Sequence, residues 1–570
     1  MQIIKWFFKL AFFLLPATVA AQTTYIPLGL KSDHFIQRLE IKSSVNSQLN
    51  FSSVKPYSRK YVIAAAAEAD SIIRGLKPNE NFRKDFSLTK IDNYNLQNLL
   101  GNNMEWTEEG DYDFASKRPL LKYFYRDKYN FYSTRSKDFF LAINPVLQLS
   151  ASFEKGNNKQ QLYVNSRGIE VRGMIAKKIG FAASVVDNQE RGPSYFVKTV
   201  RDLKAVPGYG FFKSFKRDST AIDYFDARGY ITFNAAKFID FQFGYDKNFI
   251  GNGYRSLFLS DFTNANLFFK INTRIWKLNY QNLFMELMPR FVKAGVDTLL
   301  DRKYAAMHHL SMNVTPWLNI GLFEGVIFGR TNHFDFQYLN PLIFYRHIEG
   351  MVGSPDNAVA GMDFKANIAG KAQVYGQLLL DEFILKNVKN TPTSWTNKFG
   401  FQLGAKYIDA FNIPNLDLQF ETNRVRPFTY SHNNQVANYS HYNQPLAHPL
   451  GANFQEFIGI INYQPLNKLY ITATAIYYYK GLDSAGINFG GNIFLNNTTR
   501  ASDNGFKLGG GNKTKVFYGS LDVSYEIKQN LFLDLSIQQR NQNFISGTPA
   551  NSSMVTAGIR MNMQKRKYDY

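Results

Sequence analysis

The chain has 570 residues, a formal net charge of +21 and no cysteine, which excludes a disulfide-stabilised fold and makes a large hydrogen-bonded framework the source of its stability. Aromatic residues make up 16% of the chain, with 51 Phe and 34 Tyr, while the mean hydropathy is only −0.29. Many rings at low mean hydropathy are typical of a membrane β-barrel, whose strands are half polar and whose rims carry aromatic girdles.

The N-terminal residues predict a secretory signal peptide at residues 1–21. Lys5 precedes an apolar stretch, Trp6–Leu15, and the small residues Val19–Ala21 follow. The apolar stretch is too short to cross a bilayer as a helix, so we expect cleavage rather than anchoring. In an exported protein the positive charge favours lipid phosphates and acidic polysaccharides as partners over nucleic acid, and a solvated basic surface explains it equally well.

Residues 22–136 show no alternation and predict a small, mostly helical region. Helix-forming alanines support a helix at Ser58–Leu76, and leucines at helical spacing support a second one within Asn93–Glu109. Because this region precedes the first strand, we expect it in the periplasm, with a plug inside the barrel as the alternative.

From about Asp138 the apolar residues recur with a period of two, which predicts strands with one apolar and one polar face. The clearest hairpin spans Lys515–Arg540, around a tight turn at Lys528–Asn530. In a bilayer the apolar face needs no second protein layer. We therefore predict an all-β fold for residues 137–570, a transmembrane antiparallel barrel of about 18 strands. A β-sandwich also alternates, but does not need so many strands in one domain.

The connections between the predicted strands alternate between short and long. Short turns belong to the periplasmic side of such barrels and long loops to the outside. On this pattern the last strand runs inward and leaves the C-terminus in the periplasm. The long connections are Gln189–Ala221, Asn423–Asn453 and Gly481–Lys513.

Gly251, Gly253, Tyr254 and Arg255 form the first candidate site. Backbone N–H groups and an arginine could together cradle an anion here. The alternative is a tight turn or an inward fold of the loop that needs glycine for its backbone. The segment lacks the Lys-Ser/Thr ending of a nucleotide-binding loop.

Arg424, Arg426, Tyr430 and His432 form the second candidate site, at the start of a long outer loop. Arginine matches carboxylates and phosphates, and aromatic faces stack on sugars, so these residues suit a charged polysaccharide. The alternative is an arginine ladder on the lumen wall, paired with Asp417 or Glu421.

No catalytic group, cofactor or metal site is predicted. His432, His441 and His448 are not at a recognised zinc spacing. Adjacent strand residues face opposite sides, so neither the pair Asp381 and Glu382 nor the pair His308 and His309 can act together. Ser in a Gly-x-Ser-x-Gly frame is absent from the sequence.

Several segments in order resemble the Wzi family of outer-membrane capsule-assembly barrels, and within it the Bacteroidota branch that includes the gliding-motility protein RemB. They are FGYDKNFIGNGYRSLFLS (243–260), WLNIGLFEGVIF (317–328), QYLNPLIF (337–344), YGQLLLDEF (375–383), ETNRVRPFTYSH (421–432) and HPLGAN (448–453), with DHFIQRLE (33–40) and KPYSR (55–59) fitting the branch.

The resemblance implies a non-enzymatic barrel in the outer membrane with a periplasmic helical bundle. It further implies that the protein binds acidic or neutral surface polysaccharide and helps to assemble or retain it. In the gliding branch the implied role is a surface component of motility or adhesion, with motility or export components as partners. A passive porin is the remaining alternative.

Overall fold

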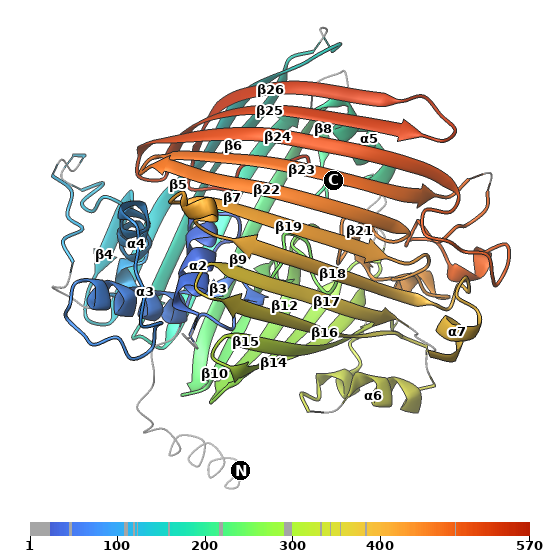
Figure 1. The fold of residues 1–570 in the computed structure, drawn as a ribbon, viewed down its shortest axis with the longest axis horizontal. Helices are drawn as coiled ribbons and strands as arrows, with labels where there is room; N and C mark the ends of the chain where they lie inside the picture. Colours follow the sequence, from blue (N-terminus) through green and yellow to red (C-terminus); the bar gives the residue numbers. More distant parts are fainter. Residues whose placement is uncertain are drawn as a thin grey trace.

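The computed structural model describes residues 23–570 except 45–47, 108–111, 118–119, 122, 158–159, 216–219, 290–298, 331–332, 343, 354, 382–384 and 485. The predicted signal peptide lies outside the described residues. The described part forms a closed antiparallel barrel of 18 long strands, with a smaller N-terminal domain at one end (Figure 1). The predicted all-β transmembrane barrel of about 18 strands is confirmed.

The long strands pair in chain order, and β26 closes the barrel by pairing with β5. Two short strands, β4 (Tyr132–Arg135) and β8 (Lys213–Phe215), add to β5 and β9. The long strands are β5 (Phe139–Glu154), β6 (Leu162–Ile175), β7 (Ile179–Arg191), β9 (Ala221–Ala236), β10 (Ile239–Asp246), β12 (Asn266–Ile275), β13 (Leu278–Leu287), β14 (Lys303–Thr315), β15 (Leu318–Phe328), β16 (Asn357–Ile368), β17 (Ala372–Asp381), β18 (Lys398–Tyr407), β19 (Leu416–Val425), β22 (Phe454–Leu466), β23 (Leu469–Leu482), β24 (Asn512–Lys528), β25 (Leu531–Phe544) and β26 (Ala550–Met561).

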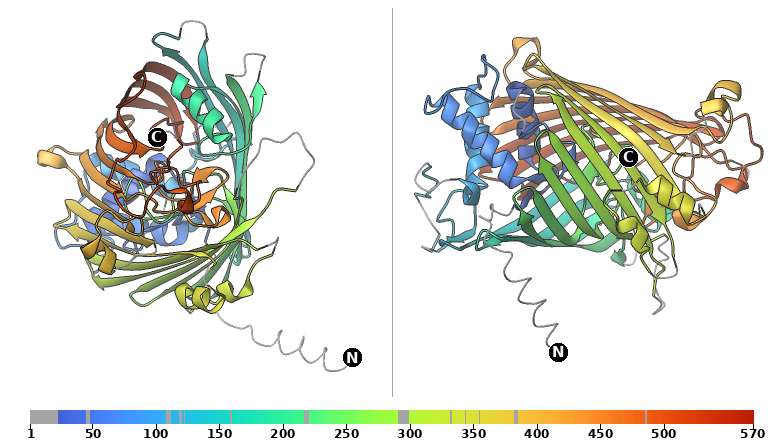
Figure 2. Two further views of the ribbon diagram at one scale, coloured as in Figure 1. Left: turned by 90° about the vertical axis from the view of Figure 1, so that its right-hand side faces the viewer. Right: turned by 90° about the horizontal axis from the view of Figure 1, so that it is seen from below.

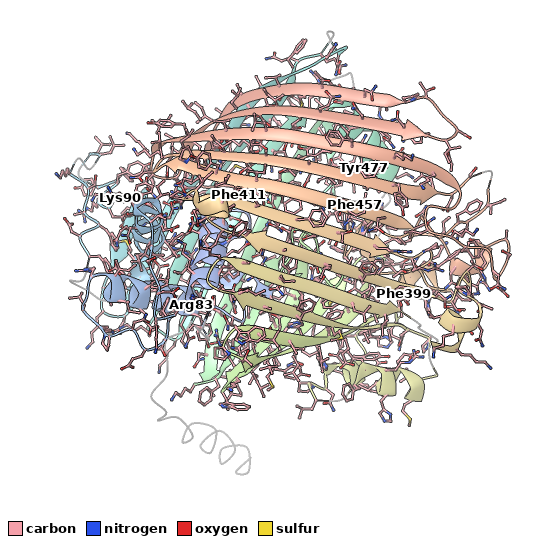
Figure 3. All side chains as sticks on the ribbon, in the orientation of Figure 1. Arg83, Lys90, Phe399, Phe411, Phe457 and Tyr477 are labelled. Carbon is pink, nitrogen blue, oxygen red and sulfur yellow. The ribbon has the colours of Figure 1, made fainter. Side chains whose placement is uncertain are left out.

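The alternation in the sequence separates an apolar outer face from a polar lumen. On β25, Leu535 and Ile537 are 47% and 51% exposed, whereas the intervening Ser536 and the next residue Gln538 are buried. Large apolar side chains this exposed would be costly in water but not against acyl chains. Aromatic rings mark the rims, such as Phe411 at one end and Tyr477 toward the other (Figure 3). None of the helices in the described part of the chain is long and apolar enough to cross a membrane.

Short turns gather at the barrel end that carries the N-terminal domain, and long connections gather at the other end (Figures 1 and 2). The last strand runs toward the short-turn end, as predicted. The prediction that it leaves the C-terminus in the periplasm is wrong, because residues 562–570 turn back into the lumen, where Tyr568 and Arg566 bind Glu190. The long connections contain α5 (Ser194–Leu203), β11 (Phe249–Ile250), η2 (Phe336–Leu339), α6 (Tyr345–Met351), α7 (Leu385–Asn390), η4 (Gln435–Ala437), β20 (Ser440–His441), β21 (Gln444–Pro445) and η5 (Asn497–Thr499); η3 (Ala410–Asn412) lies in a short-turn-end connection.

The N-terminal domain packs three helices around its own apolar core. The helix predicted at Ser58–Leu76 is α3. The helix predicted within Asn93–Glu109 is α4, which begins earlier, at Lys90, after the N-cap residue Thr89, whose side chain and that of Asp92 form a capping box. A third helix, α2, was not predicted. The elements are β1 (Tyr25–Ile26), α2 (Lys31–Ser43), β2 (Val54–Lys55), β3 (Tyr57–Ser58), α3 (Arg59–Ile73), α4 (Lys90–Gly101) and η1 (Met104–Trp106).

Arg38 joins this domain to the barrel. Its buried guanidinium contacts Asp92 of α4 at 3.0 Å, Asp409 of the β18–β19 turn at 2.9 Å, and Asp417 of β19. Lys42 lies 2.9 Å from both Asp92 and Asp409. Burial alone would raise the pKa of the Asp92 carboxyl, but the charges of Arg38 and Lys42 outweigh it and hold this pKa well below its usual range.

The connection between β15 and β16 folds back over the outer wall. Its helix α6 covers a polar contact on the outer face of β14 and β15, where His308 Nδ1 lies 2.8 Å from Glu324. The backbone amide of Tyr345 donates to Glu324 at 3.0 Å. The centre of the Tyr345 ring lies 4.0 Å from the centre of the His308 ring. His309 faces the lumen and pairs with Asp363 at 2.6 Å, so the two histidines do face opposite sides.

Replacing Arg38 should loosen the domain from the barrel. In Arg38→Ala three carboxylates lose their shared cation, and we expect a loss of about 3 kcal/mol in the docking of the domain.

Acid should also loosen the domain in the wild type. A carboxyl group whose pKa is depressed in the folded protein stabilises the fold above about pH 4, and this stabilisation is lost as the pH falls toward the depressed pKa. Limited proteolysis of residues 23–130 in detergent, at pH 7 and pH 3, measures both.

The matched control is Arg74→Ala, which removes a half-exposed partner of Asp70 on α3. Such pairs contribute less than about 1 kcal/mol. Equal protease sensitivity of the two variants would contradict the central role of Arg38.

Candidate functional site: a polar chamber and the long-loop surface

A cavity of about 630 Å³ lies inside the barrel. Its walls combine the start of α2, the inward segment 247–265, the tail 564–570 and the middle of the barrel wall. Of the described residues that line it, eleven are Lys or Arg and six are Asp or Glu, and twelve are Tyr or Phe. Aromatic faces beside fixed charges suit sugar rings with acidic substituents.

The first candidate site forms one wall of this chamber, and its anion cradle exists. The amides of Tyr254 and Arg255 donate to the two carboxylate oxygens of Glu421, at 2.7 and 3.1 Å. A Cβ atom on Gly253 would lie 2.4 Å from the same carboxylate, so only glycine allows this approach. The cradle is therefore filled by a carboxylate of the chain itself, through the inward fold that was the alternative reading.

The side chains of Tyr254 and Arg255 bind the tail. Arg255 Nη2 donates to the backbone oxygen of Asp569 at 2.5 Å, and the Tyr254 hydroxyl contacts the Asp569 carboxylate. Lys567 lies 5.1 Å from the Tyr254 ring. Gly251 stands further in, where an added Cβ would lie 2.9 Å from Gln377. Through these contacts the four residues join the inward segment 247–265 to the barrel wall and to the tail inside the lumen.

The structure does not bring the four residues of the second candidate site together. Tyr430 and His432 do not lie on an exposed loop, because residues 426–453 fold into the barrel. The buried Tyr430 hydroxyl donates to Leu257 O at 2.8 Å, and the Tyr430 amide donates to Asp381 at 2.6 Å. The His432 amide donates to Asn438 at 2.6 Å. Both residues therefore support the folded loop.

Two hydrophobic clusters separate the chamber from the long loops. The larger one joins Leu257, Tyr430 and Leu446 to the inner faces of β12–β17, β19 and β22–β24. The smaller one joins Phe196 of α5 to Tyr568 of the tail. Their strand residues come from the long-loop halves of the strands. The two clusters therefore fill much of the lumen between the chamber and the long loops.

Arg424 faces outward on β19, on the same side as Phe420, which is 54% exposed. Glu421 and Asp417 face the lumen, so the alternative of an arginine ladder paired with them is wrong. Arg426 donates to the backbone oxygens of Asn397 and Pro392 at 3.3 and 3.0 Å, which ties two long loops together.

Sequence reasoning missed an aromatic and basic group on the long-loop surface. The partly exposed Trp395 ring lies 3.9 Å from the Arg500 guanidinium, while the buried Lys398 supports the ring from below, with its Nζ 5.2 Å from the ring. Arg500 is held by Asp503 at 2.6 Å. The signal available in the sequence was Trp395 itself, one of five tryptophans, in a segment rich in Thr, Ser and Asn between two predicted strands.

Within the described ranges, no group of three or more His, Cys, Asp or Glu side chains is placed to hold a metal ion. His441 and His448 lie apart, with His441 Nε2 3.3 Å from Ala265 O and His448 Nε2 2.7 Å from Glu456. Glu382 lies outside the described residues, so its predicted orientation relative to Asp381 stays a prediction.

Gly253→Ala should destabilise the folded barrel by about 1–3 kcal/mol, because the new methyl group displaces the Glu421 carboxylate from its two amides. Thermal unfolding in detergent, followed by loss of the compact band on unboiled gels, measures the change. Gly459→Ala is the matched control, since nothing lies within 4 Å of an added Cβ there. An unchanged unfolding temperature for Gly253→Ala would show that the contact does not need glycine.

Comparison with solved structures finds the same fold in Wzi of Escherichia coli, described as an outer-membrane protein involved in group 1 capsule assembly and as a carbohydrate-binding β-barrel. The TM-score is 0.56 at 13% identity, over 96% of this chain and 100% of that chain. OprD of Pseudomonas aeruginosa (TM-score 0.40, 10% identity) and OccAB2 of Acinetobacter baumannii (0.40, 10%) each match 74% of this chain, over 94% and 97% of their own.

Among curated proteins none matches the sequence significantly. The family model described as "Capsule assembly protein Wzi" matches residues 124–545, which is more than half of the chain and includes all four of the residues in each candidate site. The chain belongs to the Wzi capsule-assembly family.

Proposed function

We propose that the protein is a non-enzymatic outer-membrane barrel that binds a surface polysaccharide and helps to assemble or retain it. The observation that carries the proposal is family membership across residues 124–545. The carbohydrate binding described for Wzi of Escherichia coli supports it. The position of the N-terminal domain at the short-turn end supports a periplasmic location for that domain, with the long loops outside the cell.

The long-loop surface is the place where such a polymer would bind, because hydrophobic clusters fill much of the lumen between the long loops and the chamber. Trp395 offers a ring face on which a sugar could stack, and Arg500 beside it offers a cation for an acidic substituent. Asn433 and Asn496 are also nearby, where the Asn496 side-chain amide donates to the backbone oxygen of Asn433 at 2.5 Å. Asparagine side chains carry amide groups of the kind that bind hydroxyls.

Trp395→Ala should weaken polysaccharide binding about tenfold or more, because it removes the stacking face and the contact that holds Arg500. A glycan array with the purified protein, followed by titration of the best ligand, gives the affinity. Trp276→Ala is the matched control, since this tryptophan is 74% exposed but lies in a short turn at the opposite end. Equal loss in both variants, or none in Trp395→Ala, would contradict the proposed surface.

A passive porin is disfavoured by what fills the barrel. The N-terminal domain, the segments 247–265 and 426–453 and the tail 562–570 all enter the lumen. In a planar bilayer the purified protein should therefore conduct far less than an open porin of similar strand number measured in parallel. Large, stable channels would favour the porin after all.

The finer assignments stay predictions. The comparisons match the Wzi family as a whole, and the Bacteroidota branch, the RemB-like role in gliding or adhesion, and motility or export partners rest on the sequence resemblance alone. The absence of enzymatic activity likewise follows from the family rather than from the site.

A further inference from the structure

Two rows of outward-facing side chains cross the wall near the long loops. The strand register places Phe457, Tyr477 and Phe517 side by side, and we call them the aromatic row. The next outward row toward the long loops, which we call the basic row, contains Arg424, Gln455, Tyr479 and Lys515. Figure 3 shows Phe457 and Tyr477 on this wall, in the half toward the long loops.

The two rows mark the boundary of the apolar surface. On the side toward the short turns the outer face continues with Phe420, Ile461 and Leu521, which are 54%, 46% and 43% exposed. On the side toward the long loops there are cations, such as Lys513, whose Nζ lies 4.1 Å from the Tyr479 ring. Aromatic rings with basic residues beside them are typical of the depth at which acyl chains meet head groups.

The cations of the basic row have no acidic partner on their own wall. None of the outward-facing residues of β19, β22, β23 and β24, all of which are described, is Asp or Glu. Arg167 on the outer face of β6 is different, because it pairs with Asp187 at 3.1 Å. Arg426 adds a further cation at the start of the adjoining loop.

Unpaired cations at head-group depth attract anionic lipid, and each contributes to binding near the surface. Arg424 and Lys515 stand three strands apart, which is about 14 Å at the usual strand spacing. That separation exceeds the width of one phosphate group. It matches a head group that carries two phosphates at the two ends of a sugar unit, while its acyl chains lie on the aromatic row and the apolar wall below.

We propose that Arg424, Lys515 and Lys513 bind the two phosphates of a bisphosphorylated glycolipid in the outward-facing leaflet. Arg424 serves the lipid rather than the polysaccharide in this arrangement. The site would fix the height of the barrel in the membrane and hold the long loops at the surface. It does not depend on the proposed binding of polysaccharide, which uses the loops above.

The test measures lipid bound by the purified full chain in detergent. Bisphosphoryl lipid A is titrated and the bound fraction is counted by native mass spectrometry. We expect the double variant R424A/K515A to bind about 20-fold more weakly, since each cation near a charged surface contributes about fivefold. Monophosphoryl lipid A should bind the wild type about fivefold more weakly than the bisphosphoryl form.

Arg167→Ala is the matched control, and it should leave lipid binding unchanged because Asp187 already neutralises that arginine. The compact band on unboiled gels shows that each variant is folded. Unchanged binding in R424A/K515A, or an equal loss in Arg167→Ala, would overturn the proposal. Displacement of the lipid by millimolar inorganic phosphate would also overturn it, because it would show a site for the free anion.

Discussion

The structure depends on the pairing of β26 with β5. Inside a bilayer no water is available to hydrogen-bond an open sheet edge, so every backbone N–H and C=O group must find a partner within the protein. The register from Met554 with Glu154 to Met561 with Leu147 closes the ring and removes both edges. Once the ring is closed, the outer face is free to be apolar, and the inner face must satisfy its own polar groups.

The way in which the inner face is satisfied distinguishes this barrel from a water-filled pore. Long segments fold inward and bring hydrogen-bond partners to the wall. Glu421 accepts from two amides of the segment 247–265, and Glu190 binds Arg566 and Tyr568 of the tail. The same segments bring the apolar side chains that fill the long-loop half. The lumen is therefore a packed interior with one polar chamber, and recognition of a large external polymer is left to the loops.

The sequence was sufficient for the features that repeat locally. Alternation at Lys515–Arg540 identified a hairpin whose inner and outer faces match the structure, and the helix-forming alanines of Ser58–Leu76 identified α3. The lengths of the connections predicted the direction of the last strand. These features depend on neighbours along the chain, so a single sequence contains the information.

The candidate sites could be predicted only in part, because their surroundings come from distant residues. Gly253, Tyr254 and Arg255 were recognised as an anion cradle, but its occupant, Glu421, is more than 160 residues away. Tyr430 and His432 follow a strand and precede polar residues, as exposed loop residues do, and nothing nearby indicates that residues 426–453 fold inward. The tail 562–570 has no periodic pattern, so its path into the lumen could not be read from its composition.

The junction at Arg38 has a consequence for the order of assembly. Its partners Asp409 and Asp417 lie about 370 residues further along the chain, on a hairpin near the middle of the barrel wall. The helices of the N-terminal domain leave the ribosome long before this hairpin exists. They can take their final position only after β18 and β19 have paired, so the domain docks late and secures a barrel whose wall is already in place.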